Sequence, residues 1–393
     1  RVNPGIRIED NGSKMGLNGV DNGRIWFSSI RVPRDAMLDK FSSISPAGAY
    51  SSAIPSISQR FAVTVGGLTT GRVLIAQAAV DAAKLGLTIA IRYGTMRKQF
   101  GEKRIIEYLS HLRRLVPGMA ETYALHFSMM DLMDKMGTPG GSKEEHVLSS
   151  GLKATATWAR VDILQNCREC CGGMGFLSAN QIGPMMSDMN VDVTFEGSNP
   201  VLMQQVSKAL LKDAKKRLAG FNPAPPAIRG HVTMDSISTV LSCREMIQLG
   251  RLAEKIQVSC KGGMTPEDAF DEHLDVVLAL ASAFIENHVF NVFAQRAQEA
   301  DPGLQPVLVE LCMLYGLGRL EKDSAFFLST GSVSPKQAIA IHDRCNELCR
   351  SLGQDRGALL LQLCDGFGIP EQFITAPIAR DSTSFPSTAH AKL

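Results

Sequence analysis

The chain has 393 residues, of which 45% are hydrophobic and 20% are charged, and its 41 Lys and Arg residues nearly balance its 39 Asp and Glu residues. This composition is typical of a globular protein and excludes disordered and collagen-like chains. The small net charge, with no strongly basic stripe, argues against nucleic acid as a main partner. Aromatic residues make up only 6%, which favours helices over a β-sandwich.

The cysteines and the apolar stretches both point to an ordinary packed interior. Nine cysteines are an odd number in a chain too long to need a disulfide framework, so we expect reduced thiols. His342, Cys345 and Cys349 share a helical face, but no further ligand cluster accompanies them, and we predict core packing and no metal site. We also predict no membrane span, because charged residues interrupt or end the apolar stretches 61–87 and 276–285.

The first 40 residues are predicted to be β-structure. Asp21-Asn22-Gly23 is a strong hairpin-turn signal, and residues 24–32 form a β-prone run that Pro33 closes. A single hairpin is not stable alone, so this segment should belong to a larger sheet. Because the sequence starts with Arg1, without a secretory signal, and reads like the middle of a domain, we expect a fragment or a processed chain.

Helical periodicity begins near Ser56 and predicts a four-helix bundle over residues 56–217. The expected helices run to about Gly94, then over 105–136, from Ser142 towards Cys170, and from Asn199 onward. Glu145 completes a capping box with Ser142. Asn199 is the expected N-cap of the fourth helix, with Pro200 at its first position.

A second helical domain is predicted over residues 231–380. The Pro-rich stretch 220–230 separates it from the bundle. Its helices are expected at about 234–257, 266–298, 303–322 and 335–365. The remaining tail, residues 381–393, is polar and is expected to be mobile.

Glu196 is the first candidate for chemistry. We expect Val193-Thr194-Phe195 to form a strand that delivers Glu196 into a tight connection, where Gly197 permits unusual backbone angles. The following helix N-terminus favours an ionised carboxylate, which beside an apolar pocket could act as a base. The alternative is a loop glutamate that only complements the helix dipole.

Two further segments could contact a cofactor. Arg97, in the run Arg97-Lys98-Gln99-Phe100-Gly101, could bind a phosphate, or it could only satisfy carbonyls at a helix end. The glycine-rich turn at Gly172 and Gly173 could bring bare backbone amides to a cofactor, or it could simply stop a helix. It lacks the strand-turn-helix setting of a dinucleotide fingerprint.

The final three residues, Ala391, Lys392 and Leu393, match the pattern of a C-terminal peroxisomal targeting signal.

Taken together, these segments resemble the acyl-CoA oxidase family of peroxisomal β-oxidation. The resemblance is carried by five stretches in the family's order: residues 14–25 (KMGLNGVDNGRI), 31–34 (RVPR), 97–101 (RKQFG), 171–176 (CGGMGF) and 194–197 (TFEG). Acyl-CoA dehydrogenases are similar through the Glu-Gly segment but usually end soon after it, whereas this chain continues into a second helical domain.

The resemblance implies a mainly α fold that lacks the family's N-terminal portion: the C-terminal part of a β-domain, a four-helix bundle that contacts flavin, and a second C-terminal helical domain. It implies that FAD is the cofactor, and that Glu196 removes the α-proton of a fatty acyl-CoA. The products would be trans-2-enoyl-CoA and, after reoxidation by O2, hydrogen peroxide.

In this resemblance Arg97 reaches FAD bound mainly to the neighbouring subunit, Gln99 and Phe100 shape that contact, and Gly172 and Gly173 approach the adenosine side. A homodimer in the peroxisome is therefore implied, with the terminal tripeptide read by the import receptor. Two alternatives stay open, an acyl-CoA dehydrogenase and a truncated, non-catalytic paralogue that pairs with full-length oxidase subunits.

Overall fold

The β-structure near the start of the chain consists of two small antiparallel sheets in the computed structural model, which describes residues 2–136, 143–221, 228 and 232–381. β1 (Ile6–Asp10) pairs with β2 (Gly23–Phe27), and β3 (Ser42–Ile44) pairs with β4 (Tyr50–Ser52). The predicted tight turn at 21–23 is wrong, because Gly23 already pairs with Asp10 and residues 11–22 connect the strands.

The strand predicted over residues 24–32 is also shorter than expected. β2 ends at Phe27, opposite Ile6, and the amide of Ser28 donates to the Gly5 carbonyl at 2.8 Å just beyond the paired residues. Ser29 then adopts a left-handed conformation with φ of 54°, which turns the chain away. The loop between β1 and β2 reaches the helical body, where the amide of Leu17 donates to Asp188 Oδ1 at 2.9 Å.

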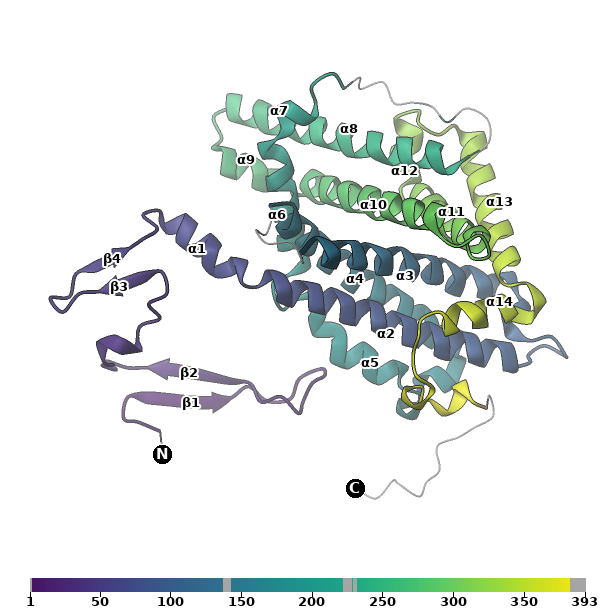
Figure 1. Cartoon of the computed structure of the whole chain (residues 1–393), viewed down its shortest axis with the longest axis horizontal. Coiled ribbons are helices and arrows are strands. Elements are labelled where there is room, and N and C mark those ends of the chain that lie inside the picture. Colours follow the sequence, from purple (N-terminus) through teal and green to yellow (C-terminus); the bar gives the residue numbers. More distant parts are fainter. Residues whose placement is uncertain (1, 137–142, 222–227, 229–231, 382–393) are drawn as a thin grey trace.

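The helices of the first half lie close to their predicted positions, and Figure 1 shows α2, α3 and α4 side by side. Their bounds are α1 (Ile57–Gly66), α2 (Thr69–Met96), α3 (Leu109–Met136), α4 (Lys143–Cys170), α5 (Ile182–Asp188), α6 (Asn199–Lys212) and α7 (Ala214–Arg217). Small residues face the interior of α2, among them Ala76, Ala83 and Ala90, and they let the neighbouring helices approach closely. The predicted N-cap at Ser142 lies outside the described residues.

The second half is helical as predicted, but two of the expected long helices are broken. The bounds are α8 (Met234–Lys261), α9 (Pro266–Glu272), α10 (Leu274–Glu299), α11 (Gln305–Lys322), α12 (Ser324–Ser329), α13 (Pro335–Leu352) and α14 (Gln354–Asp365). The breaks fall at His273 and at Gly353. Immediately after the second break, Asp355 and Arg356 adopt left-handed conformations that helical periodicity does not reveal.

The two predicted helical domains share one hydrophobic core. The larger buried cluster contains residues of α2, α3 and α4 together with residues of α10, α11 and α13. Phe127 of α3 packs against Phe293 of α10 with ring centroids 5.5 Å apart. Most of the Pro-rich linker lies outside the described residues, but Ile228 is buried and its amide donates to the Ser332 carbonyl at 3.1 Å.

Two helices of the described part, α2 and α10, are long and apolar enough to cross a membrane by length and composition. Within their most apolar windows, 67% of α2 and 56% of α10 is buried in the protein, as is usual for core helices. The absence of a membrane span therefore stays a prediction.

Candidate active site

Glu196 lies on a strained turn just before α6. It has a φ of 54° and Gly197 a φ of 106°, so two consecutive residues occupy the left-handed region. The strand predicted for Val193-Thr194-Phe195 is wrong: residues 189–193 form a 3₁₀ turn, and the amides of Thr194 and Phe195 both donate to the Val191 carbonyl. Those local bonds satisfy the backbone in place of a partner strand.

The side chain of Glu196 is held against the first turn of α2. A Cβ atom at Gly71 would lie 2.6 Å from Glu196 Oε1, so only glycine leaves room for the carboxylate there. Glu196 Oε2 is buried and has no hydrogen-bond partner among the described residues. Because α2 begins at Thr69 and α6 at Asn199, two helix N-termini point their partial positive charge toward this region.

Two buried cations hold the backbone of the Glu196 turn. Arg72 Nε donates to the Glu196 carbonyl at 3.2 Å, and Lys153 Nζ donates to the Gly197 carbonyl at 2.9 Å. Burial lowers the pKa of Arg72, while the Glu196 charge opposes that shift. The sequence analysis did not predict a role for these two cations. Each is a charged residue on a helix face that otherwise carries small and apolar residues, a pattern that can indicate a buried charge with a function.

The N-cap of α6 differs from its prediction. Ser198, not Asn199, occupies the cap position, with φ of −54° and ψ of 135°, and Pro200 is therefore the second residue of the helix and not the first. Asn199 is fully buried, and its side chain contacts α4 instead of capping its own helix.

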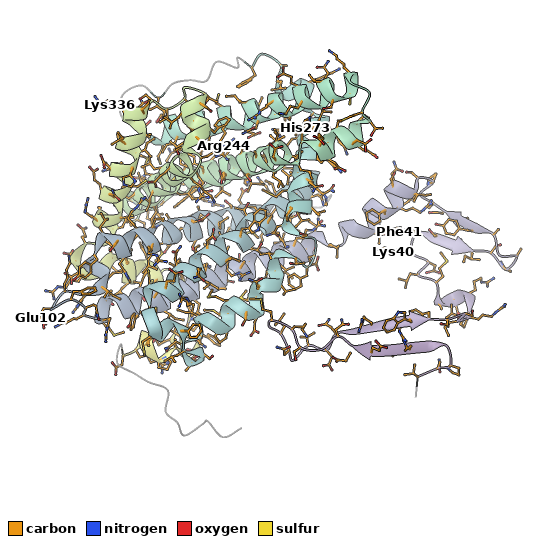
Figure 2. The ribbon with its side chains drawn as sticks, turned by 180° about the vertical axis from the view of Figure 1, so that it is seen from behind. Lys40, Phe41, Glu102, Arg244, His273 and Lys336 are labelled. Carbon is orange, nitrogen blue, oxygen red and sulfur yellow. The ribbon has the colours of Figure 1, made fainter. Side chains whose placement is uncertain are left out.

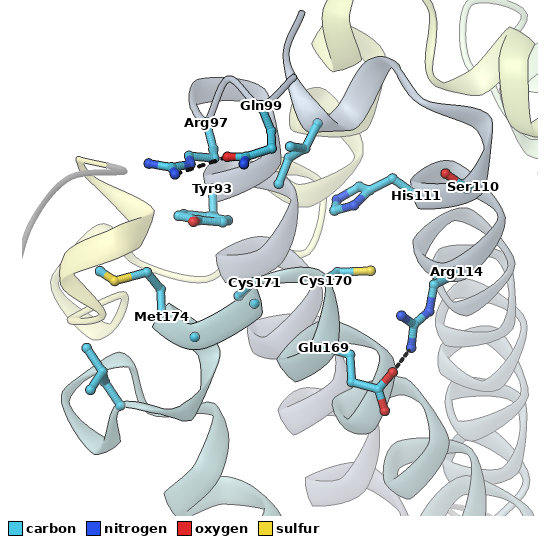
Figure 3. A pocket seen from close by; sticks show the side chains of 14 residues that line it. Tyr93, Arg97, Gln99, Ser110, His111, Arg114, Glu169, Cys170, Cys171 and Met174 are labelled. Atoms are coloured by element: carbon cyan, nitrogen blue, oxygen red, sulfur yellow. Dashed lines mark hydrogen bonds and ion pairs between the residues drawn. The ribbon is translucent and has the colours of Figure 1, made fainter. Parts of the chain in front are cut away.

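A pocket of about 870 Å³ lies at the other end of α2 (Figure 3). Four of the predicted cofactor residues line it: Arg97, Gln99, Gly172 and Gly173. Its remaining walls come from Tyr93 and Ile105, the first turns of α3 (Ser110, His111, Arg114), the end of α4 (Glu169, Cys170) and the segment after it (Cys171, Met174, Leu177). Phe100 does not line the pocket; it is 88% exposed and packs its edge on Tyr108.

Both arginines of this pocket interact with another side chain that lines it. Arg97 Nη2 donates to Gln99 Oε1 at 3.1 Å, and Arg114 forms an ion pair with Glu169 (Figure 3). Burial, helped by the Arg114 charge, lowers the pKa of His111 to about 4, so its ring is neutral. Burial also raises the pKa of Cys170 to about 11, which keeps that thiol protonated and unreactive.

The cysteines of the chain are unpaired thiols. All nine cysteines are free in the structure. No group of three or more potential ligands that could hold a metal ion occurs within the described ranges. His342 Nδ1 lies 2.6 Å from Glu321 Oε1, while Cys345 and Cys349 are buried. The tripeptide Ala391, Lys392 and Leu393 lies outside the described residues.

Glu196 and the pocket are far apart in one chain. Glu196 contacts Gly71 near the start of α2, whereas Tyr93 and Arg97 lie at its end. At 1.5 Å per residue, Gly71 and Tyr93 are separated by roughly 33 Å along the helix. A single chain therefore cannot bring the Glu196 carboxylate and this pocket to the same reacting atom.

Comparison with known proteins identifies relatives over nearly the whole chain. The family model described as "Acyl-CoA oxidase, C-alpha1 domain" matches residues 65–211, and the model described as "Acyl-CoA oxidase" matches residues 233–382. The chain is 34% identical to acyl-coenzyme A oxidase 2, peroxisomal, of Arabidopsis thaliana, in an alignment that covers 97% of this chain and 60% of the plant protein.

Solved structures of acyl-CoA oxidases also match nearly the whole chain. A crystal structure of acyl-CoA oxidase 3 from Yarrowia lipolytica matches with a TM-score of 0.86 and 29% identity, covering 97% of this chain and 60% of the yeast chain. Acyl-CoA oxidase-1 of Caenorhabditis elegans, solved in complex with FAD and ATP, matches with a TM-score of 0.82 over 97% of this chain and 60% of its own. At 21% identity the nematode structure shows likeness of fold alone. The chain thus spans about 60% of the length of these relatives.

Proposed function

Because the chain belongs to the acyl-CoA oxidase family, we propose that it works as an FAD-dependent oxidase of fatty acyl-CoA in peroxisomal β-oxidation. The reaction would convert acyl-CoA and O2 to trans-2-enoyl-CoA and hydrogen peroxide. The observation that carries this proposal is the Glu196 carboxylate, held on a strained turn against Gly71 with a buried oxygen that has no partner in the described part of the chain.

Glu196 is suited to remove the α-proton of a thioester. A carboxylate oxygen that is shielded from water and not already hydrogen-bonded is free to accept a proton. Gly71 lets the carboxylate lie directly on α2, and the left-handed backbone at Glu196 and Gly197 fixes the direction from which it approaches a ligand. The Glu196 amide, in the same turn, is the expected donor to the thioester carbonyl.

The pocket at the far end of α2 fits part of a nucleotide cofactor. It offers the Arg97 guanidinium, the N-terminal end of α3 with its partial positive charge, and two glycines, Gly172 and Gly173, that expose bare backbone. A Cβ atom at either glycine would meet nothing within 4 Å, so their backbone is open to a ligand. When bound, FAD supplies the hydride acceptor for the substrate β-carbon and transfers the electrons to O2.

Two chains would be needed to complete each site. The roughly 33 Å between Gly71 and Tyr93 along α2 means that Glu196 of one chain and Arg97 of another would serve the same flavin. This agrees with a homodimer in which the pocket receives the part of FAD that extends from the neighbouring subunit. Import through Ala391, Lys392 and Leu393 would place that dimer in the peroxisome.

The test compares Glu196→Gln with Gly71→Ala in the flavin-loaded protein. Glu196→Gln removes the base, whereas Gly71→Ala leaves it in place but adds a methyl group 2.6 Å from its oxygen. Both variants should lose α-proton exchange of an acyl-CoA in D2O while retaining bound flavin. Gly318→Ala is the matched control, because a Cβ there meets nothing within 4 Å on another long helix, α11.

The wild-type protein must also consume O2 and release peroxide in equal amounts. Flavin reduction without peroxide release would indicate a dehydrogenase, and failure to bind flavin or substrate would indicate a non-catalytic partner subunit. Exchange that survives in Glu196→Gln would refute the assignment of the base.

A further inference from the structure

Lys153 on α4 occupies a position where a charged group is costly. Its side chain is completely buried, with 0% of its surface exposed. Burial is the main cause that lowers its pKa to about 8, although the carboxylates of Asp192 and Glu196 favour the charged form and Arg72 opposes it. An apolar side chain of similar length would avoid the free-energy cost of desolvating a charge. The stability of the helix therefore does not explain why a lysine occupies this position.

The ammonium of Lys153 bridges α4 to the turn that carries Glu196. Its Nζ donates to the Gly197 carbonyl at 2.9 Å and to Asn199 Oδ1 at 3.0 Å. Asn199 is itself fixed, because its Nδ2 donates to Thr157 Oγ1 of α4 at 2.8 Å. Lys153, Asn199 and Thr157 are each 0% exposed. We call these three residues the α4 clamp.

The α4 clamp contacts the backbone where it is most strained. The left-handed conformation of Glu196, with φ of 54°, is strained and persists only when its surroundings hold it. The carbonyl of Glu196 is held by Arg72 from α2, and the next carbonyl, that of Gly197, is held by Lys153 from α4. Two helices thus fix consecutive peptide groups, and a small rotation of either would swing the carboxylate away from Gly71.

Other charged groups surround the clamp. Asp192 is buried in the 3₁₀ segment that precedes the turn, and burial raises its pKa while the Arg160 and Lys153 charges oppose that shift. Burial lowers the pKa of His146, with a further contribution from Arg72, so that ring is neutral. The positive charge of Lys153 therefore interacts with Asp192 as well as with the Glu196 turn, and loss of this charge would affect both.

We propose that Lys153 is a positioning residue for Glu196, acting through the α4 clamp to hold the Glu196–Gly197 turn in its strained, reactive conformation. The inference rests on the proposed role of Glu196 as base. It assigns Lys153 no contact with substrate or cofactor. Its effect is on the rate of proton removal and on the mobility of the turn.

The first test is the rate of α-proton exchange in the flavin-loaded protein. Lys153→Met should lower that rate about 100-fold, since a displacement near 1 Å can cost this much, while KM for acyl-CoA changes little. The matched control is Lys84→Met. Lys84 is also buried, at 5% exposure, but it pairs with Asp81 roughly 20 Å along α2 from Gly71. The Lys84→Met variant should be less stable than the wild type but should retain the wild-type rate of α-proton exchange.

The second test needs neither cofactor nor substrate. Amide hydrogen exchange of residues 194–199 in the 393-residue chain should become faster in Lys153→Met but not in Lys84→Met. Thr157→Val, which keeps the shape and removes only the hydroxyl that accepts from Asn199, should shift both readouts in the same direction by a smaller factor. This variant preserves the test if Lys153→Met fails to fold.

The outcomes separate the two proposals. If Lys153→Met and Thr157→Val match Lys84→Met in both readouts, Lys153 is only structural and the clamp is refuted. If Glu196→Gln retains exchange, the proposed function fails whatever the lysine variants do. Partial rescue of a Lys153→Ala variant by added methylammonium would further support the clamp, because a structural defect would not respond to a small cation.

Discussion

His111 is the pocket residue whose chemistry depends most on pH. Its Nε2 atom is buried, has no hydrogen-bond partner among the described residues and faces the backbone of Gly94, where a Cβ would lie 3.2 Å away. Burial and the charge of Arg114 lower the pKa of His111 to about 4. The folded protein therefore takes up the His111 proton only at a pH well below that at which an exposed histidine does.

We expect His111→Gln to reduce the acid sensitivity of the fold. Between the ordinary histidine pKa of 6.5 and about 4, His111 is protonated in the unfolded chain and neutral in the folded chain. The free energy of unfolding therefore decreases as the pH is lowered through this range. At pH 5 the contribution is up to about 2 kcal/mol, from about 1.4 kcal/mol per pKa unit. Urea unfolding of both proteins at pH 7.5 and pH 5 measures it.

The pH 7.5 comparison serves as the internal control, because both side chains are neutral there and any difference reflects packing. Equal losses of stability between pH 7.5 and pH 5 in the two proteins would show that His111 titrates normally.

Sequence reasoning identified single residues when their local context carried a signal. Glu196 stood out because a glycine and a helix start follow it, and Arg97, Gln99, Gly172 and Gly173 indeed line one pocket. Arg72 and Lys153 were missed as functional residues. Their partners lie 124 and 44 positions away along the sequence, and only the packing of α2 and α4 against the turn brings them together.

At the scale of elements, the sequence predicted the helices more closely than the strands, although all of β2 except its first residue lies within the predicted run 24–32. Helical periodicity placed α3 and α4 within a few residues of their observed ends, because an amphipathic helix satisfies its own backbone and needs only one face covered. A strand needs a partner. Val193–Phe195 has a β-prone composition but no neighbouring strand in the described part of the chain, so it forms turns instead.

A buried charge network joins the elements that the sequence assigned to separate domains. Arg319 of α11 contacts Glu121 of α3 at 3.1 Å and Glu286 of α10 at 3.5 Å. Arg244 of α8, labelled in Figure 2, pairs with Glu286 as well. Burial alone would lower the pKa of Arg319, but the two carboxylates raise it overall.

Removing the central cation of this network should cost much more than removing an exposed one. Arg319→Met would leave Glu121 without its cation in a poorly solvated site, a change that typically costs about 3–5 kcal/mol. Arg344 pairs with Glu347 on the exposed side of α13, and Arg344→Met should cost about 1 kcal/mol or less. Urea unfolding compares the two, and equal losses would mean that the network does not hold the two halves together.

At the scale of the whole molecule, α2 is the element that sets the distance between the two parts of the site. It carries Gly71 against Glu196 at one end and contributes Tyr93 to the pocket at the other. The sequence indicated both parts through separate motifs but did not indicate their separation. That distance follows from an unbroken helix between them, and it is the reason for the proposal that two chains share each site.

A mixture of two inactive variants tests whether sites are shared between chains. Glu196→Gln and Arg97→Ala should each be nearly inactive alone. In a mixed dimer, one site combines both defects, while the other combines an intact Glu196 with an intact Arg97 from the neighbouring chain. Random mixing makes half of the dimers hybrid, so about a quarter of wild-type activity should return. If verified hybrid dimers, isolated with two different affinity tags, stay inactive, Glu196 and Arg97 do not serve a common site across the dimer.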